Sequence, residues 1–388
     1  MFALPDPDAP APTRPDRPVL RVRSTAELLA LVPVTLGFEP AESLVVVATA
    51  GSQPGFQTRV DLPEPRAAGA VADQVVDAVV HQGCTRVAVI AFSARPRTAE
   101  QVVLAVGERV RASGVEVLDL LRTDGSRYWS LLCTDPRCCP SIGTPYDPLA
   151  TTLRAEAVLA GRTVAPDRAA LAARYAAVSG AAVGPARAAL RAAEADAVAV
   201  LGLRGTRQLR RPSIRAVSAA APLGAVRVDA LLDALLAAAG PGGPGWSGGP
   251  ERVAAAVTDE HAATLSVWCS LQPVRDLAWA RMTRADAARH LALWTTVSQR
   301  VLPPYERAVL GLTAFAAWLS GDGASAWCVL DRCAEVDRRY PMAALVADAL
   351  HRCVSPDAWK PFPRALALEA CGLPAADGGW SPRGSRRV

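Results

Sequence analysis

Three of the nine cysteines, Cys133, Cys138 and Cys139, fall close together in a turn-rich stretch between residues 124 and 147. Zinc binds a tetrahedral set of Cys and His side chains, usually in closely spaced pairs. The metal candidates are therefore these three with Cys84, or with His81 beside it, as the fourth ligand. Adjacent cysteines cannot easily both face one tetrahedral ion, so the pattern favours a structural turn over zinc. The sequence names no other cofactor.

A second set of polar residues lies near the ends of predicted strands. The segment 93–98 joins a buried strand to a helix start, and its two arginines and unpaired helix amides would suit an anion. The candidate ligand-binding residues are Glu42, Ser43, Asp61, Ser93, Arg95, Arg97 and Arg127. No Gly-rich phosphate loop accompanies them, which excludes a P-loop nucleotide site. Solvated loop charges are the alternative explanation.

Catalytic motifs are scarce. The four histidines, His81, His261, His290 and His351, lie in neither a Gly-x-Ser-x-Gly nor a His-Glu-x-x-His pattern. The sequence therefore favours a non-catalytic binding or regulatory protein, with a small anionic ligand or a partner segment at the sheet edge and protein contacts through the helical half. The alternatives are an enzyme with Asp61 or Glu42 as base and Arg95 as anion clamp, or a Cys-ligated metal protein. Whether the chain is an enzyme stays open.

Composition restricts the partners. The net charge of +5 comes almost wholly from arginine, because Lys360 is the only lysine. The densest basic run spans residues 204–215, without nearby aromatic residues or a recognition helix, so nucleic acid is an unlikely partner. The start of the chain has no signal-peptide pattern, and no apolar run is long enough to cross a membrane. We expect a cytoplasmic protein with reduced thiols.

The first half of the chain alternates strands and helices. Ser24 and Glu27 form a capping box for a helix that should end at Pro33. Continuous or alternating apolar runs predict strands, and helical spacing predicts two helices between them. The predicted strands are 44–48, 57–62, 87–92, 115–121 and 128–133, with helices over 67–81 and 98–112.

This order predicts a mixed sheet, with two crossovers joining parallel strands and two tight turns joining antiparallel ones. The strands ending at residues 62, 92 and 121 should then terminate at one end of the sheet, where the first and fifth strands begin. Cys84 and Cys133 should share the opposite end. We expect the Cys138–Cys139 turn to fold back across that end, largely buried, with Tyr128 or Trp129 packed on the helical half.

The fold class is thus α/β plus α. A disordered Pro-rich start (1–18) precedes a mixed five-stranded α/β domain (19–149). An all-helical domain (150–380) with a Gly/Pro loop (240–250) follows, and a disordered basic tail (381–388) ends the chain. Within the helical part, Trp318–Ala326 and the Tyr340-Pro341 pair resemble one tetratricopeptide-type hairpin, with helices meeting at a Gly-Asp turn.

Several segments together resemble one known family. They are Leu36–Val47, Arg59–Leu62, Tyr128–Pro140 with Gly143, and the Ala-Ala-Trp-Leu-Ser-Gly-Asp-Gly run at 316–323. They are similar to an actinobacterial family catalogued as domain of unknown function 4192. The resemblance implies an actinobacterial cytosolic protein, and it implies no activity, substrate or catalytic residue.

Overall fold

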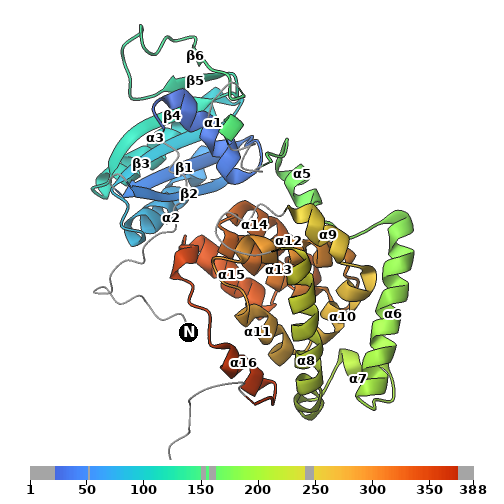
Figure 1. Cartoon of the computed structure of the whole chain (residues 1–388). Coiled ribbons are helices and arrows are strands. Elements are labelled where there is room, and N and C mark those ends of the chain that lie inside the picture. Colours follow the sequence, from blue (N-terminus) through green and yellow to red (C-terminus); the bar gives the residue numbers. More distant parts are fainter. Residues whose placement is uncertain (1–21, 51–52, 150–153, 157–162, 241–248, 375–388) are drawn as a thin grey trace, which may run out of the picture. The chain divides into compact units, whose positions relative to one another are not determined.

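The computed structural model describes residues 22–50, 53–149, 154–156, 163–240 and 249–374. The predicted disordered ends (1–18 and 381–388) and most of the Gly/Pro loop lie outside these ranges. The chain forms two compact units, coloured along the sequence in Figure 1. The first, here the α/β unit, comprises Met1–Arg174, Gly321–Cys328 and Ala344–Ala358. The second, here the helical unit, comprises Tyr175–Ser320, Val329–Ala343 and Trp359–Val388.

The α/β unit contains a mixed sheet of six strands, one more than predicted. The spatial order is β2-β1-β3-β4-β5-β6. The strands are β1 (Ser43–Ala50), β2 (Gln53–Asp61), β3 (Arg86–Phe92), β4 (Glu116–Thr123), β5 (Arg127–Ser130) and β6 (Thr144–Pro145). Helices α1 (Thr25–Leu36), α2 (Ala68–His81), α3 (Pro96–Ala112) and α5 (Arg168–Ala173) accompany them. The extra strand, β6, has only two residues, too few for a sequence pattern.

The predicted strand directions are confirmed. Strand β1 runs antiparallel to β2 and β3, β3 runs parallel to β4, and β4 runs antiparallel to β5. The register places Ser43 beside both Asp61 and Phe92, and Phe92 beside Thr123. Because Thr123 also pairs with Tyr128, the start of β5 lies at this same end. We call it the polar end of the sheet.

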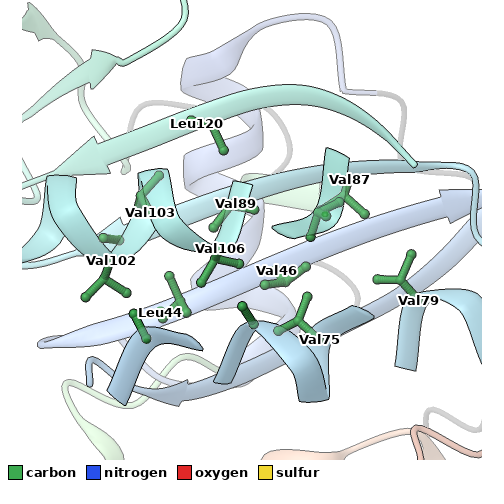
Figure 2. Packing of buried hydrophobic residues seen from close by; sticks show 14 of the residues in the cluster. Leu44, Val46, Val75, Val79, Val87, Val89, Val102, Val103, Val106 and Leu120 are labelled. Carbon is green, nitrogen blue, oxygen red and sulfur yellow. The ribbon is translucent and has the colours of Figure 1, made fainter. Parts of the chain in front are cut away.

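One face of the sheet is covered by α2 and α3 through aliphatic side chains (Figure 2). Leu44, Val46 and Val89 are at most 1% exposed there. Each such side chain contributes roughly 1.5–3 kcal/mol when buried. Gly107 allows α3 to approach β4 closely, since a Cβ at this position would lie 2.5 Å from Leu120 Cδ2. This packing holds the β3–α3 connection, which carries Ser93 and Arg95, against a rigid sheet.

Helix α1 lies on the opposite face of the sheet (Figure 2). Ser24 caps it as predicted, by accepting a hydrogen bond from the Glu27 backbone N–H at 3.2 Å. Two details differ from the prediction. The Glu27 carboxylate accepts from the N–H of Arg23 rather than from that of Ser24, and the helix continues through Pro33 to Leu36. Gly37, with a φ of 75°, ends it by donating to the Pro33 carbonyl.

The second half of the chain is helical, as predicted. Its helices are α6 (Val183–Val200), α7 (Thr206–Arg210), α8 (Ile214–Ala238), α9 (Pro250–Ala256), α10 (Asp259–Cys269), α11 (Gln272–Ala280), α12 (Ala287–Arg300), α13 (Glu306–Ser320), α14 (Gly323–Val336), α15 (Pro341–His351) and α16 (Arg364–Ala370). Trp268 and Trp294 are at most 1% exposed and belong to the core of the helical unit. Among the described residues, no helix combines the length and hydrophobicity that crossing a bilayer requires.

Candidate functional site

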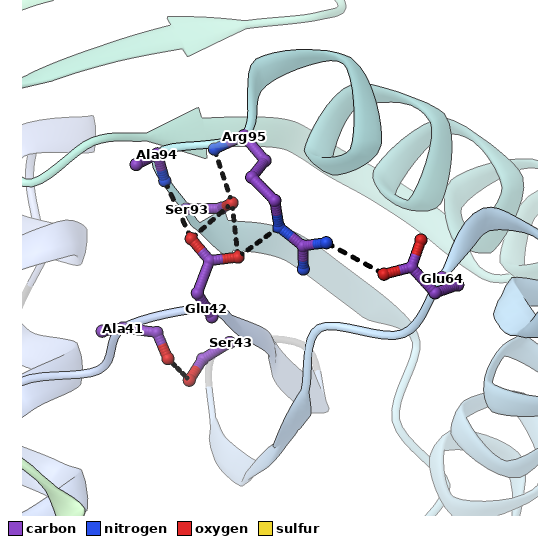
Figure 3. A network of polar contacts seen from close by, with 7 residues as sticks. All are labelled: Ala41, Glu42, Ser43, Glu64, Ser93, Ala94 and Arg95. Carbon is purple, nitrogen blue, oxygen red and sulfur yellow. Dashed lines mark hydrogen bonds and ion pairs between the residues drawn. The ribbon is translucent and has the colours of Figure 1, made fainter.

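At the polar end, Glu42 is the centre of a hydrogen-bond network (Figure 3). Its carboxylate accepts from Ser93 Oγ at 3.0 Å, from the Ala94 backbone N–H at 3.1 Å and from Arg95 Nε at 2.8 Å. The three donors belong to the β3–α3 connection, and Glu42 directly precedes β1. The sheet topology therefore brings together Glu42, Ser93 and Arg95, as the strand directions predicted.

The Arg95 guanidinium is already balanced by acidic groups. Its Nε pairs with Glu42, and its Nη1 donates to Glu64 Oε1 at 2.9 Å (Figure 3). An incoming anion would have to displace one of these carboxylates. The proposed role of Arg95 as an anion clamp is therefore weakened. Glu64 was absent from the predicted site, although it follows β2 by a few residues and so belongs to the same end.

Glu42 also has an unusual backbone. Its φ of 43° lies in the left-handed region, which costs a non-glycine residue roughly 1 kcal/mol or more. Burial acts to raise the pKa of the carboxyl group, but the hydrogen bonds from Arg95, Ser93 and Ala94 outweigh it and lower the pKa below its usual value. Glu42 is therefore charged near neutral pH and is a poor candidate for a general base.

Ser43 and Asp61 are joined through Arg59. Ser43 is fully buried, and its Oγ donates to the Ala41 carbonyl (Figure 3) and accepts from Arg59 Nε at 2.9 Å. Arg59 Nη1 pairs with Asp61 at 2.7 Å, and the guanidinium lies 5.7 Å from the ring centroid of Phe38. Asp61, whose side chain is 89% exposed, is thus paired with an arginine at the surface.

The other two predicted residues do not join this network. Arg97 is exposed in the first turn of α3, and its side chain has no hydrogen bond or ion pair recorded with another described residue. Arg127 instead donates to the backbone carbonyl of Gly143 at 2.8 Å. It therefore ties β5 to the segment that carries the cysteines. The predicted ligand set thus separates into the Glu42 network, the Arg59 group and two arginines that belong to neither.

The three cysteines form a second cluster on residues 131–143, which we call the thiol loop. The sulfur atoms of Cys133, Cys138 and Cys139 all lie within 4.8 Å of one another. The Cys138 and Cys139 sulfurs are 3.9 Å apart, so adjacent cysteines do face one point here, contrary to the expectation from their spacing. Cys138 is exposed, while Cys133 and Cys139 are half-buried.

Backbone hydrogen bonds shape the thiol loop. The Asp135 carbonyl accepts from the N–H groups of both Cys138 and Cys139, at 3.1 and 2.8 Å. At the start of the loop, Ser130 Oγ accepts from the Cys133 N–H at 3.2 Å and donates to Asp119 of β4 at 2.7 Å. The convergence of the thiols therefore follows from a turn that the main chain and the sheet hold in place.

The thiols differ in acidity. A hydrogen bond from the Asp135 backbone N–H, with further ones from Cys139 and Cys138, lowers the pKa of Cys133. Burial, together with hydrogen bonds with Cys133 and Cys138, raises the pKa of Cys139 to about 12. Cys133 therefore loses its proton more readily than Cys139.

Trp129 anchors the far side of the loop. Its indole Nε1 donates to the Ser141 carbonyl at 3.0 Å, and its ring packs on the Arg122 guanidinium with 3.5 Å between the ring centroid and Cζ. Gly143 passes against this ring with a φ of 81°, and a Cβ there would lie 2.5 Å from Trp129 Cε2. After the loop, the chain forms β6, which pairs antiparallel with β5 and so closes the loop.

Two predictions about this segment are wrong. The turn is largely exposed rather than buried. Cys84 does not join the cluster; it lies in the core before β3, and a Cβ on Gly55 would lie 2.9 Å from its sulfur. The reason is that β5 stops at Ser130, opposite Leu121 in the interior of β4, so the chain leaves the sheet before it reaches the level of Cys84. His81 is also outside the cluster.

Comparison with known proteins gives a family and no activity. Neither the curated proteins nor the solved structures include a match to this chain. The family model described as domain of unknown function (DUF4192) matches residues 26–357, which covers the sheet, the thiol loop and most of the helices. The chain therefore belongs to the DUF4192 family.

Proposed function

We propose that this is a non-catalytic metal-binding protein whose site is the thiol loop. The observation that carries the proposal is the convergence of three sulfur atoms within 4.8 Å on a loop that solvent reaches. Among the described residues, no other group of three or more Cys, His, Asp or Glu side chains brings its ligand atoms this close. Thiolates are soft ligands and select thiophilic ions over magnesium or calcium.

The sulfur separations agree with shared coordination. Two thiolates on one ion, each about 2.3 Å from the metal, lie roughly 3.8–4.0 Å apart in tetrahedral or trigonal geometry. The Cys138–Cys139 separation of 3.9 Å already falls in this range. Small side-chain rotations would bring Cys133, within 4.8 Å of both, to the same ion. Cys84 is excluded as a ligand by its position in the core.

The surroundings of the loop support binding rather than catalysis. A metal-bound water needs a nearby base, and the Asp135 carboxylate instead accepts hydrogen bonds from the backbone N–H, Nε and Nη2 of Arg137. We further propose the reducing cytoplasm of an actinobacterium as the setting, since it would keep the cysteines free to bind metal. No disulfide is recorded among the cysteines of the described ranges.

Metal analysis of the full chain, purified anaerobically with reductant, tests this function. We expect one thiophilic ion per chain, and a thiolate-to-metal absorption band when the metal-free protein is titrated with Co²⁺. Cys139→Ser should lose the band, whereas Cys353→Ser, which removes a thiol outside the loop, should keep it. Failure of Zn²⁺, Co²⁺ and Cu⁺ all to bind the reduced wild-type chain would contradict the proposal.

A second candidate is a small ligand or a partner segment at the polar end. The left-handed backbone of Glu42 favours it, because strained residues gather at functional sites. A thermal-shift screen against a metabolite library, repeated with Glu42→Gln, would identify such a ligand. Turnover of a hit, abolished by Asp61→Ala, would establish an enzyme instead. Nucleic acid is not proposed as a partner, in part because Arg210 in the basic run is paired with Glu194 at 2.7 Å.

A further inference from the structure

The number of protein ligands in the thiol loop limits which metal ion can bind there. Three sulfurs converge, and among the described residues no fourth Cys, His, Asp or Glu places a ligand atom within the same 4.8 Å. Zinc in structural sites is almost always held by four protein ligands, and iron–sulfur clusters generally require four cysteines. A site of three thiolates therefore binds either zinc, with one coordination position left open, or an ion that three soft ligands satisfy.

The open zinc site is the weaker alternative. Zinc with an open position serves catalysis, in which a bound water is deprotonated and used. The Asp135 carboxylate is tied to Arg137, and it is absent from the group of convergent ligand atoms. Among the described residues, no histidine belongs to that group either. The chemistry that would use an open zinc position therefore lacks a partner at this loop.

Hydrogen bonds within the protein also hold the shape of the loop. The Asp135 carbonyl accepts hydrogen bonds from two cysteine N–H groups. Ser130 fixes the start of the loop to β4, and the Trp129 indole holds the far side of the loop by its hydrogen bond to Ser141. A structural zinc site, in contrast, supplies folding energy to a segment that is unfolded without metal. Since Cys138 is exposed, an ion could enter and leave from solvent without unfolding the loop.

We infer that the thiol loop reversibly binds a soft monovalent ion of the Cu⁺ type, coordinated by the three thiolates of Cys133, Cys138 and Cys139. This inference rests on the proposed metal-binding function and specifies its ion. Thiolates select Cu⁺, Zn²⁺ and iron–sulfur clusters, and the convergence of three sulfurs without a fourth ligand favours Cu⁺ among them. The exposed position makes the loop suited to exchange of the ion rather than to permanent storage.

X-ray absorption and chelator competition on the reduced full chain test the inference. Cu⁺ should bind once per chain, with three sulfur neighbours at about 2.3 Å and no nitrogen or oxygen neighbour. Each of Cys133→Ser, Cys138→Ser and Cys139→Ser should weaken Cu⁺ binding by at least about tenfold, since even outer-shell changes have such effects. Cys353→Ser should leave it unchanged. Zn²⁺ should be lost readily to a chelator that leaves Cu⁺ bound.

Two results would overturn the inference and leave the metal-binding function intact. One is Zn²⁺ held against the chelator with a fourth protein ligand in its absorption spectrum. The other is Cu⁺ with two sulfur neighbours, accompanied by one cysteine of the three that can be replaced without effect. If neither ion binds in a way that depends on Cys139, the inference and the proposed function both fail.

Discussion

The Glu42 carboxylate illustrates how single residues at the polar end are stabilised in their charged forms. It accepts hydrogen bonds from three residues and has a lowered pKa. A carboxylate with a lowered pKa in the folded state binds fewer protons there than in the unfolded chain. Its contribution to stability is therefore present above the ordinary pKa of 4.5 and is lost as the pH falls through the lowered value.

This dependence of stability on pH gives a prediction for Glu42→Gln. At pH 7 the variant should be less stable than the wild type by about 1 kcal/mol or less, because the side chain is partly exposed and solvent screens the pair. The difference should vanish in strongly acidic solution, where the wild-type carboxyl is itself neutral. Urea unfolding curves across this pH range measure it.

Asp77→Asn is the matched control for this prediction. Asp77 is an exposed carboxylate on α2 that makes no ion pair with another described residue, so Asp77→Asn should leave the stability at pH 7 close to that of the wild type. A Glu42→Gln difference that persists undiminished at acidic pH would show that the effect is steric rather than electrostatic.

At the scale of elements, β5, the thiol loop and β6 form one unit around Trp129. The Trp129 ring cannot easily shift, because it packs on Arg122 and its Nε1 is bonded to Ser141. Gly143→Ala should therefore destabilise the α/β unit by about 1–3 kcal/mol through overpacking, and it should weaken metal binding by displacing the loop.

Gly114→Ala separates the two causes of the destabilisation expected for Gly143→Ala, which are the strained backbone and the collision with Trp129. Gly114 has a φ of 85°, close to the 81° of Gly143, but a Cβ there would meet nothing within 4 Å. It should show the backbone cost alone and leave metal binding unchanged. Thermal unfolding and metal titration of both variants provide the comparison, and equal losses would exclude a special role for the Trp129 contact.

The elements also show how far sequence reasoning reaches. Strand directions were predictable, because right-handed crossovers and tight turns leave few arrangements for this order of strands and helices. The position of Cys84 was not, because it depends on β5 ending at Ser130, and no turn residue marks that point. The convergence of Cys138 and Cys139 depends on the two hydrogen bonds to the Asp135 carbonyl, a detail that spacing does not specify.

The pairing of charges at the polar end could likewise not be predicted from the sequence. Arg95 suggested an anion site because the sequence shows which charges lie near strand ends but not which ones pair. Glu64, four positions after Val60 of β2, reaches Arg95 through the path that the chain takes after β2. Pairing of this kind depends on side-chain positions within a few ångströms, which the strand pattern leaves undetermined.

At the scale of the whole molecule, acid should lower the stability of the helical unit through a buried histidine. In the helical unit, His290 on α12 is 1% exposed, and no described group bonds its Nδ1. Burial lowers the pKa of His290 to about 4; the nearby Arg281 and Arg289 act in the same direction, and Asp286 opposes them. The histidine is therefore neutral in the folded chain at pH values where it is protonated in the unfolded chain.

The unfolded chain thus binds the additional proton between the ordinary pKa of 6.5 and about 4, so the helical unit should lose stability as the pH falls through this window. The expected loss is roughly 3 kcal/mol. Urea unfolding followed by tryptophan fluorescence, to which the buried Trp268 and Trp294 contribute, should show it between pH 7 and pH 4. His290→Gln, which cannot titrate, should have a flatter pH dependence. His261→Gln, at a capping-box position where Gln is also favoured, is the control for replacing a histidine with glutamine. A wild-type slope in His290→Gln would assign the acid response to other groups, and the carboxylates of both units would then be the next to replace.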